Sequence, residues 1–207
     1  MALPAIATGS SSPSPSGSRG GSAAMFSPCG RYRWWLQRHW DATKPVLLFI
    51  GLNPSRADGE RDDPTLRRLQ RFARAWGYGG LEVLNLFARI SASPAVLRRC
   101  SDPVGPDNDR WLIRRLAALP DGPAAIWLGW GNGGSWRGRD REVLQRLAAR
   151  PPGTPGPPAD TRTGAPPLLA LGLTASGQPR HPLYAPGDAQ PRLLLHPGTE
   201  FSLVPSS

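Results

Sequence analysis

The sequence predicts one α/β domain, a three-layer sandwich in which helices cover both faces of a mostly parallel central sheet. Short apolar runs alternate along the chain with helical patterns, as in right-handed β–α–β connections. The runs are unbroken, which is typical of strands buried on both faces. The predicted strands are one aromatic-rich segment, 31–38, and four apolar runs, 46–50, 81–86, 125–128 and 168–171.

Three helices are predicted between these strands. The clearest begins at Asp63-Pro64-Thr65, because aspartate is a good N-cap and proline fits the first helical turn. It ends at Gly77, after an apolar stripe with helical spacing. The stripe consists of Leu66, Leu69, Phe72, Ala73 and Trp76. The other two helices are expected at 108–119 and 136–150, each with leucines along one face.

The chain of 207 residues is long enough for one domain with tails. Residues 1–24 consist mostly of Ser, Pro, Gly and Ala, and are predicted to be a disordered extension. Met25, where the composition changes, is a candidate for the true start. We therefore expect one domain at 26–186, with a Pro- and Gly-rich loop at 151–167 and a loosely structured tail at 187–207.

Several classes of protein are not favoured by the sequence. No apolar run approaches the ~18–20 residues of a membrane span, and no secretory signal pattern is present. Cys29 and Cys100 fit no zinc-binding spacing and are expected to be reduced thiols in a cytoplasmic protein. The dinucleotide, phosphate-loop, zinc-protease and serine-hydrolase motifs are missing, so no cofactor and no metal are expected. The oligomeric state is not predicted.

The chain is strongly basic, with a formal net charge of +10, and Lys44 is its only lysine. Arginine suits phosphate groups, so a nucleic acid or a nucleotide is a candidate partner. A GC-rich genome would also replace lysine by arginine, and the two explanations remain open. Arg67, Arg68 and Arg71, on the helix that starts at residue 64, are candidates for phosphate binding. A solvated helix face is the alternative.

Polar or aromatic residues follow every apolar run. Ligands of open α/β sheets bind beyond the carboxyl ends of the strands, so these residues are expected to line one pocket. The candidates for substrate binding are Ser55, Asn85, Phe87, Trp130, Arg180 and Tyr184, and those for catalysis are Asn53, Asp58 and His181.

Each catalytic candidate has a chemical reason and a structural alternative. The Asn53 amide both donates and accepts, so it can hold a water, or it can brace its own loop. Asp58 belongs to an acidic segment that could act as a general base, bind Mg²⁺ or simply be solvated. His181 could donate a hydrogen bond to a developing anion or shuttle a proton.

Over residues 26–186 the chain resembles a bacterial family of unknown function, DUF1643. The resemblance is carried by several motifs in the same order, and it implies no settled activity. The motifs are Cys29–Arg33, Leu48–Ser55 with Ala57-Asp58, Asp63–Thr65 with Arg67-Arg68, Trp76–Tyr78, Asn85–Ala88, Asp102–Pro106 with Asn108-Asp109, and Gly177–Tyr184.

A more distant similarity is to mismatch-type uracil-DNA glycosylases. Gly51–Ser55 resembles their Gly-x-Asn-Pro-Gly turn, in which the asparagine positions the attacking water, although Ser55 replaces the final glycine. His181-Pro182 resembles their late His-Pro motif, which helps to stabilise the departing base. His196-Pro197 is a rival match, and no base-stacking aromatic is identified. The resemblance implies a glycosylase-like fold and, as a hypothesis, hydrolysis of an N-glycosidic bond. The alternative is a non-catalytic module that binds a nucleotide or a nucleic acid.

Overall fold

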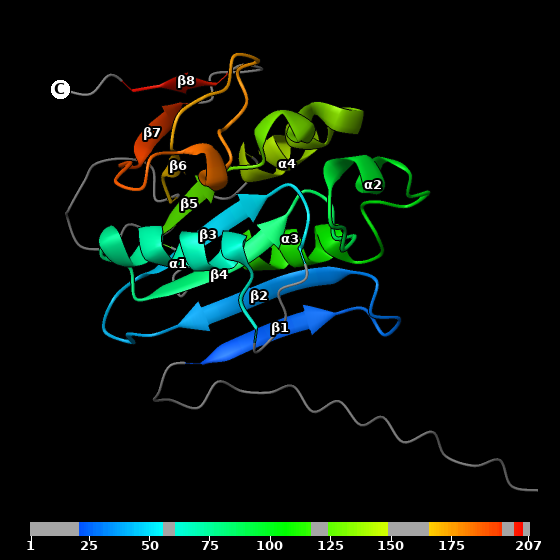
Figure 1. The fold of residues 1–207 in the computed structure, drawn as a ribbon, viewed down its shortest axis with the longest axis horizontal. Coiled ribbons are helices and arrows are strands. Elements are labelled where there is room, and N and C mark those ends of the chain that lie inside the picture. The colour runs from blue at the N-terminus through cyan, green and yellow to red at the C-terminus, as the bar shows by residue number, and fades with distance from the viewer. Residues whose placement is uncertain (1–20, 56–60, 117–123, 149–165, 196–200, 205–207) are drawn as a thin grey trace, which may run out of the picture.

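The computed structural model describes residues 21–55, 61–116, 124–148, 166–195 and 201–204. In these ranges the chain forms an eight-stranded sheet in the order β1-β2-β4-β3-β5-β6-β7-β8 (Figure 1). The strands are β1 (Ser22–Phe26), β2 (Arg33–His39), β3 (Val46–Gly51), β4 (Gly80–Asn85), β5 (Ala125–Leu128), β6 (Leu168–Ala170), β7 (Arg192–Leu195) and β8 (Ser202–Leu203).

The sheet is mixed, with a parallel centre and antiparallel edges. Strands β4, β3, β5 and β6 are parallel to their neighbours within this central group. The β1–β2, β2–β4, β6–β7 and β7–β8 pairings are antiparallel. The prediction of a mostly parallel sheet was therefore wrong. Adjacent strands such as β1 and β2 are joined by too few residues for the crossover that a parallel pairing requires.

Helices cover both faces of the sheet. They are α1 (Pro64–Ala75), α2 (Pro94–Arg98), α3 (Asn108–Leu116) and α4 (Arg139–Ala148), together with two 3-10 segments, η1 (Gly131–Gly138) and η2 (Pro182–Tyr184). Helix α1 lies across the face of the sheet nearer the viewer in Figure 1. Phe49 of β3 packs with α1, whereas Ile50 of the same strand packs with α3 and α4. The sheet thus lies between two helical layers.

The predicted start of α1 is confirmed. Asp63 Oδ1 accepts a hydrogen bond of 2.7 Å from the Leu66 amide, and Pro64 occupies the first turn. Helix α4 begins at Arg139 rather than at residue 136. The delay has a local cause, because Trp136 is extended and Arg137 has a φ of 57°, in the left-handed region.

The N-terminal domain boundary expected at residues 24–26 falls inside β1, and the segment expected after residue 186 contributes two strands. Strand β1 begins at Ser22, three residues before Met25, and Ser22, Ala23 and Ala24 pair with β2. Strands β7 and β8 lie within the segment 187–207 that was expected to be loosely structured. Backbone pairing, which needs no apolar pattern, accounts for both results. None of the helices in the described ranges combines the length and apolar character that a membrane crossing requires.

Candidate functional site

A cavity of about 430 Å³ lies at the carboxyl ends of the central parallel strands. Asn53 follows β3, Asn85 ends β4, Trp130 follows β5, and His181 precedes η2; all four line the cavity. Parallel strands bring their carboxyl ends to one edge of a sheet, and this edge is where α/β proteins bind their ligands. Helix α1 supplies a further wall through Thr65, Leu66 and Leu69.

The structure brings most of the predicted site residues together. Lining the main cavity are Asn53, Ser55, Asn85, Trp130, His181 and Tyr184. Arg180 lines an adjoining cavity of about 350 Å³, which shares Gly131, Asn132, His181 and Tyr184 with the main one. Asp58 lies outside the described residues.

The remaining candidates lie elsewhere. Phe87 is fully buried in the core, where its ring packs 5.0 Å from that of Trp136. Arg68 binds the backbone at both ends of η2: its Nε donates a hydrogen bond of 2.9 Å to the oxygen of Pro182, the first residue of η2, and its Nη2 donates to the oxygen of Ala185, which follows η2. Arg68 therefore fixes η2 against α1. Arg67 and Arg71 are exposed and line a separate shallow hollow on α1.

Asn53 braces the loop that follows β3. Its Nδ2 donates to the Pro54 oxygen at 3.0 Å and to the Ser91 oxygen at 3.1 Å. The Ser91 amide in turn donates to the Pro54 oxygen at 3.1 Å. These bonds tie together two loops of the cavity wall and fix the orientation of the Asn53 amide. Asn53 therefore has the loop-bracing role that the sequence analysis gave as its structural alternative, and within the described residues no hydrogen bond to its Oδ1 is present.

Among the residues that line the cavity, Asn85 and Asp63 each have a buried polar atom without a hydrogen-bond partner in the described part of the chain. These atoms are Nδ2 of Asn85, a donor, and Oδ2 of Asp63, an acceptor. An unsatisfied buried polar group costs about 1–3 kcal/mol, so such atoms call for an explanation. A bound ligand that offers an acceptor and a donor would satisfy both.

His181 is held as a neutral ring. Burial lowers its pKa, and the nearby Asp63 carboxylate only partly opposes this effect. Its Nδ1 accepts a hydrogen bond of 3.3 Å from the Leu183 amide, so the proton of the neutral ring lies on Nε2. His181 can therefore donate from Nε2 at neutral pH.

The two aromatic candidates differ in their freedom. Trp130 is 2% exposed and is fixed by a polar chain, in which its Nε1 donates to Gln178 Oε1 at 2.7 Å. Gln178 Nε2 then donates to Asp140 Oδ2 at 2.9 Å. Tyr184 is 78% exposed at the cavity, with its ring centre 5.9 Å from that of His181. The Trp130 ring is therefore fixed in the cavity wall, whereas the Tyr184 ring is largely exposed to solvent.

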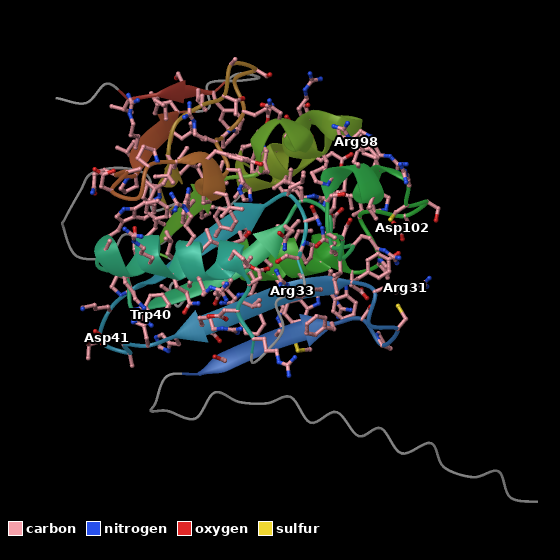
Figure 2. The ribbon with its side chains drawn as sticks, in the orientation of Figure 1. Arg31, Arg33, Trp40, Asp41, Arg98 and Asp102 are labelled. Atoms are coloured by element: carbon pink, nitrogen blue, oxygen red, sulfur yellow. The ribbon has the colours of Figure 1, made fainter. Side chains whose placement is uncertain are left out.

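Sequence reasoning missed Arg33 and Arg98, which also line the cavity. Figure 2 labels both residues, one on β2 and the other on α2. Strand β2 is antiparallel to β4, so its first residue, Arg33, reaches the edge where β4 ends. The residues predicted to line the cavity all follow strands, whereas Arg33 begins a strand and Arg98 ends a helix. The available signal was an arginine within an aromatic, strand-like segment.

The structure is that of an α/β protein with a cavity, lined by polar and apolar side chains, at the carboxyl edge of a mixed sheet. The described residues contain no group of three or more His, Cys, Asp or Glu side chains placed to hold a metal ion. The model of the family described as "Protein of unknown function (DUF1643)" matches residues 33–183. The chain belongs to this family. No curated protein and no solved structure matches it.

Proposed function

We propose that the cavity binds a nucleobase and that the protein hydrolyses the N-glycosidic bond of a nucleoside, a nucleotide or a nucleic acid. The observation that carries the proposal is that one cavity wall contains a buried donor, Asn85 Nδ2, and a buried acceptor, Asp63 Oδ2, that have no partner within the described residues. The edge of an oxo-base such as uracil or hypoxanthine offers a carbonyl oxygen and a ring N–H, the partners that this donor and this acceptor require. The volume of about 430 Å³ lies in the usual range for small-molecule sites.

In the reaction, a water oxygen bonds to C1′ of the sugar and the C1′–N bond breaks. The departing base takes the bonding electron pair. A carboxylate accepts the proton of the water. Asp58, the base expected from the sequence, stays a prediction.

Two further residues have roles in this proposal. His181 donates from Nε2 to the base as its negative charge develops, which a neutral imidazole does without a prior change of protonation. The amide of Asn53 is held through its nitrogen by two carbonyl oxygens, so its Oδ1 can orient the attacking water. The resemblance to uracil-DNA glycosylases supports the same assignment for both residues.

A non-catalytic module for nucleotides or nucleic acid is the second candidate. The exposed arginines of α1 favour it, because Arg67, Arg71 and Arg74 lie three to four residues apart on one helix face. Such a row of arginines can follow the phosphate backbone of a nucleic acid. Binding of the nucleic acid would then weaken steeply as the salt concentration rises.

The test is a base-release assay with nucleosides, nucleotides and DNA that contains uracil, hypoxanthine or mismatched bases. We expect one class of substrate to release free base. Asn85→Ala should lower that rate by about 10²-fold, whereas the exposed, remote Gln145→Ala should leave it unchanged. Salt-sensitive binding with no base released from any substrate would contradict hydrolysis and favour the module.

A further inference from the structure

The second cavity, of about 350 Å³, adjoins the main one and is rich in hydrogen-bond donors. Arg180 and Thr174 line the second cavity and do not line the main one. None of the described residues in its wall is an aspartate or a glutamate, so no carboxylate among them opposes the charge of the guanidinium. A ligand can extend from one cavity into the other, because four residues line both. The shared residues are Gly131, Asn132, His181 and Tyr184.

Arg180 and Thr174 both have donors to offer a ligand. The Arg180 side chain is exposed, and within the described residues it forms one hydrogen bond, of 3.3 Å from Nη2 to the Leu173 oxygen. A guanidinium has five N–H donors, so most of them remain available. Thr174 Oγ1 accepts a hydrogen bond of 3.2 Å from the Gln178 amide, which leaves its hydroxyl hydrogen to be donated. A group with several acceptor atoms and a negative charge suits these donors.

The backbone that carries Arg180 is fixed to the walls of both cavities. The Arg180 amide donates to the Gly172 oxygen at 2.9 Å, and Leu173 forms an antiparallel bridge with Pro179. The Pro179 oxygen also accepts a hydrogen bond of 2.8 Å from the amide of Gly131, which lines both cavities. These bonds hold the two walls together before a ligand arrives, so little backbone entropy is lost when a ligand binds.

We propose that Arg180 and Thr174 bind a phosphate group of the substrate while its base lies in the main cavity, which makes the substrate a nucleotide unit rather than a free base or nucleoside. This inference rests on the proposed function. A planar guanidinium can donate two parallel hydrogen bonds to a phosphate. In a nucleotide the sugar separates the phosphate from the base, and two adjoining cavities give each of them its own place.

The phosphate takes no part in the proposed reaction. The products of hydrolysis are a free base and a sugar phosphate, and no bond to phosphorus changes. The phosphate can belong to a free nucleotide or to an oligonucleotide, because both offer the same acceptor oxygens.

The shallow hollow on α1 suits this phosphate less well. Arg67 and Arg71 line it, but so does Asp62, whose carboxylate repels an anion. The hollow shares no lining residue with the main cavity. A phosphate bound there would not lie beside a base in the main cavity.

The experiment is calorimetric titration of the full chain with matched probes. They are uridine, its 3′- and 5′-monophosphates, inosine, its 5′-monophosphate, a trinucleotide with uridine at its centre, and inorganic phosphate. The wild-type protein should bind at least one phosphate-containing nucleotide probe about fivefold or more tightly than the matching nucleoside, because the guanidinium forms charge-assisted hydrogen bonds although solvent screens it in part. This preference should shrink as the salt concentration rises.

The same titrations identify the source of the phosphate. A higher affinity for a monophosphate than for the trinucleotide would identify a free nucleotide. The reverse order would identify a nucleic acid.

Three variants test the role of Arg180. Arg180→Gln should remove the preference for phosphate and leave nucleoside binding within about twofold. Arg180→Lys, which keeps the charge but loses the planar fork, should retain part of the preference. Arg141→Gln makes the same change of charge at an exposed position of α4 that lines neither cavity, and it should retain all of the preference.

Equal binding of the nucleosides and of all their phosphate-containing counterparts by the wild-type protein would overturn the inference without any variant. A preference that survives in Arg180→Gln would also overturn it. In both cases nucleoside binding and base release could still be observed, and the proposed function would stand. Binding of inorganic phosphate that depends on Arg180, with no nucleoside bound and no base released, would support the phosphate site and contradict the proposed function.

Discussion

The substitution Asn53→Ala distinguishes two roles of this side chain. One role is to stabilise the loop after β3, and the other is to orient the attacking water. The substitution removes hydrogen bonds from Nδ2 to two backbone oxygens, those of Pro54 and Ser91. A typical intramolecular hydrogen bond contributes about 0.5–1.5 kcal/mol, so the two together predict a loss of about 1–3 kcal/mol. For a protein of this size, 1 kcal/mol corresponds to roughly 2–4 °C, which predicts that Tm falls by about 2–12 °C.

The assay is thermal unfolding of Asn53→Ala beside a matched control from the same cavity. Asn132 is exposed and lines the cavity, and no hydrogen bond from its side chain is present within the described ranges. Asn132→Ala should therefore change the free energy of unfolding by no more than about 0.5 kcal/mol. Base release by Asn53→Ala should fall by about 10²-fold, more than its partial loss of stability explains.

Two results would contradict these expectations. Equal Tm values for Asn53→Ala and Asn132→Ala would show that the two hydrogen bonds contribute no stability. A lowered Tm with unchanged base release by the folded protein would leave Asn53 as a bracing residue only, and the attacking water would need another partner.

Three further outcomes are expected. Hydrogen bonds with Ser27 and Arg31 lower the pKa of Cys29 to about 6. The rate at which Cys29 reacts with iodoacetamide should therefore rise with pH with a midpoint near pH 6, and a midpoint near pH 8.5 would contradict this. Gln178→Leu should lower the free energy of unfolding by about 1–3 kcal/mol by leaving the buried Trp130 N–H unpaired, and urea unfolding at an unchanged midpoint would count against it. The pKa of His181 is lowered in the folded protein, so the unfolded chain takes up the proton first as the pH falls below about 6.5. Stability should thus decline from pH 7 to pH 5 more in the wild-type protein than in His181→Gln, and parallel profiles would exclude this contribution.

The parts of the fold that follow local rules were predictable from the sequence. The Asp63 cap and the proline after it specify the start of α1 within a few residues. The unbroken apolar run at 46–50 is typical of a strand buried on both faces, and it forms β3. Strand β1 could not be found in this way, because Ser22, Ala23 and Ala24 carry no strand pattern. They are ordered by pairing with β2, which is a non-local interaction.

The same distinction applies to the site. Residues that directly follow parallel strands, such as Asn53, Asn85 and Trp130, were predicted because the direction of those strands decides which edge they reach. Arg33 is the first residue of an antiparallel strand and lies at an irregularity in the β1–β2 register, and neither feature is visible without the pairing of β2 with its neighbours. Phe87 follows β4 by only two residues but packs inward against Trp136, a contact between segments far apart in the sequence.

Binding of a nucleobase at Asn85 is tested most directly by the side-chain amide resonance of this residue in solution NMR. The resonance can be assigned by its loss in Asn85→Ala. Titration with uracil, hypoxanthine and adenine should move it in a saturable manner for at least one base, because its unpaired Nδ2 gains an acceptor. A resonance that stays in place with all three bases at millimolar concentration would contradict a nucleobase site in this cavity.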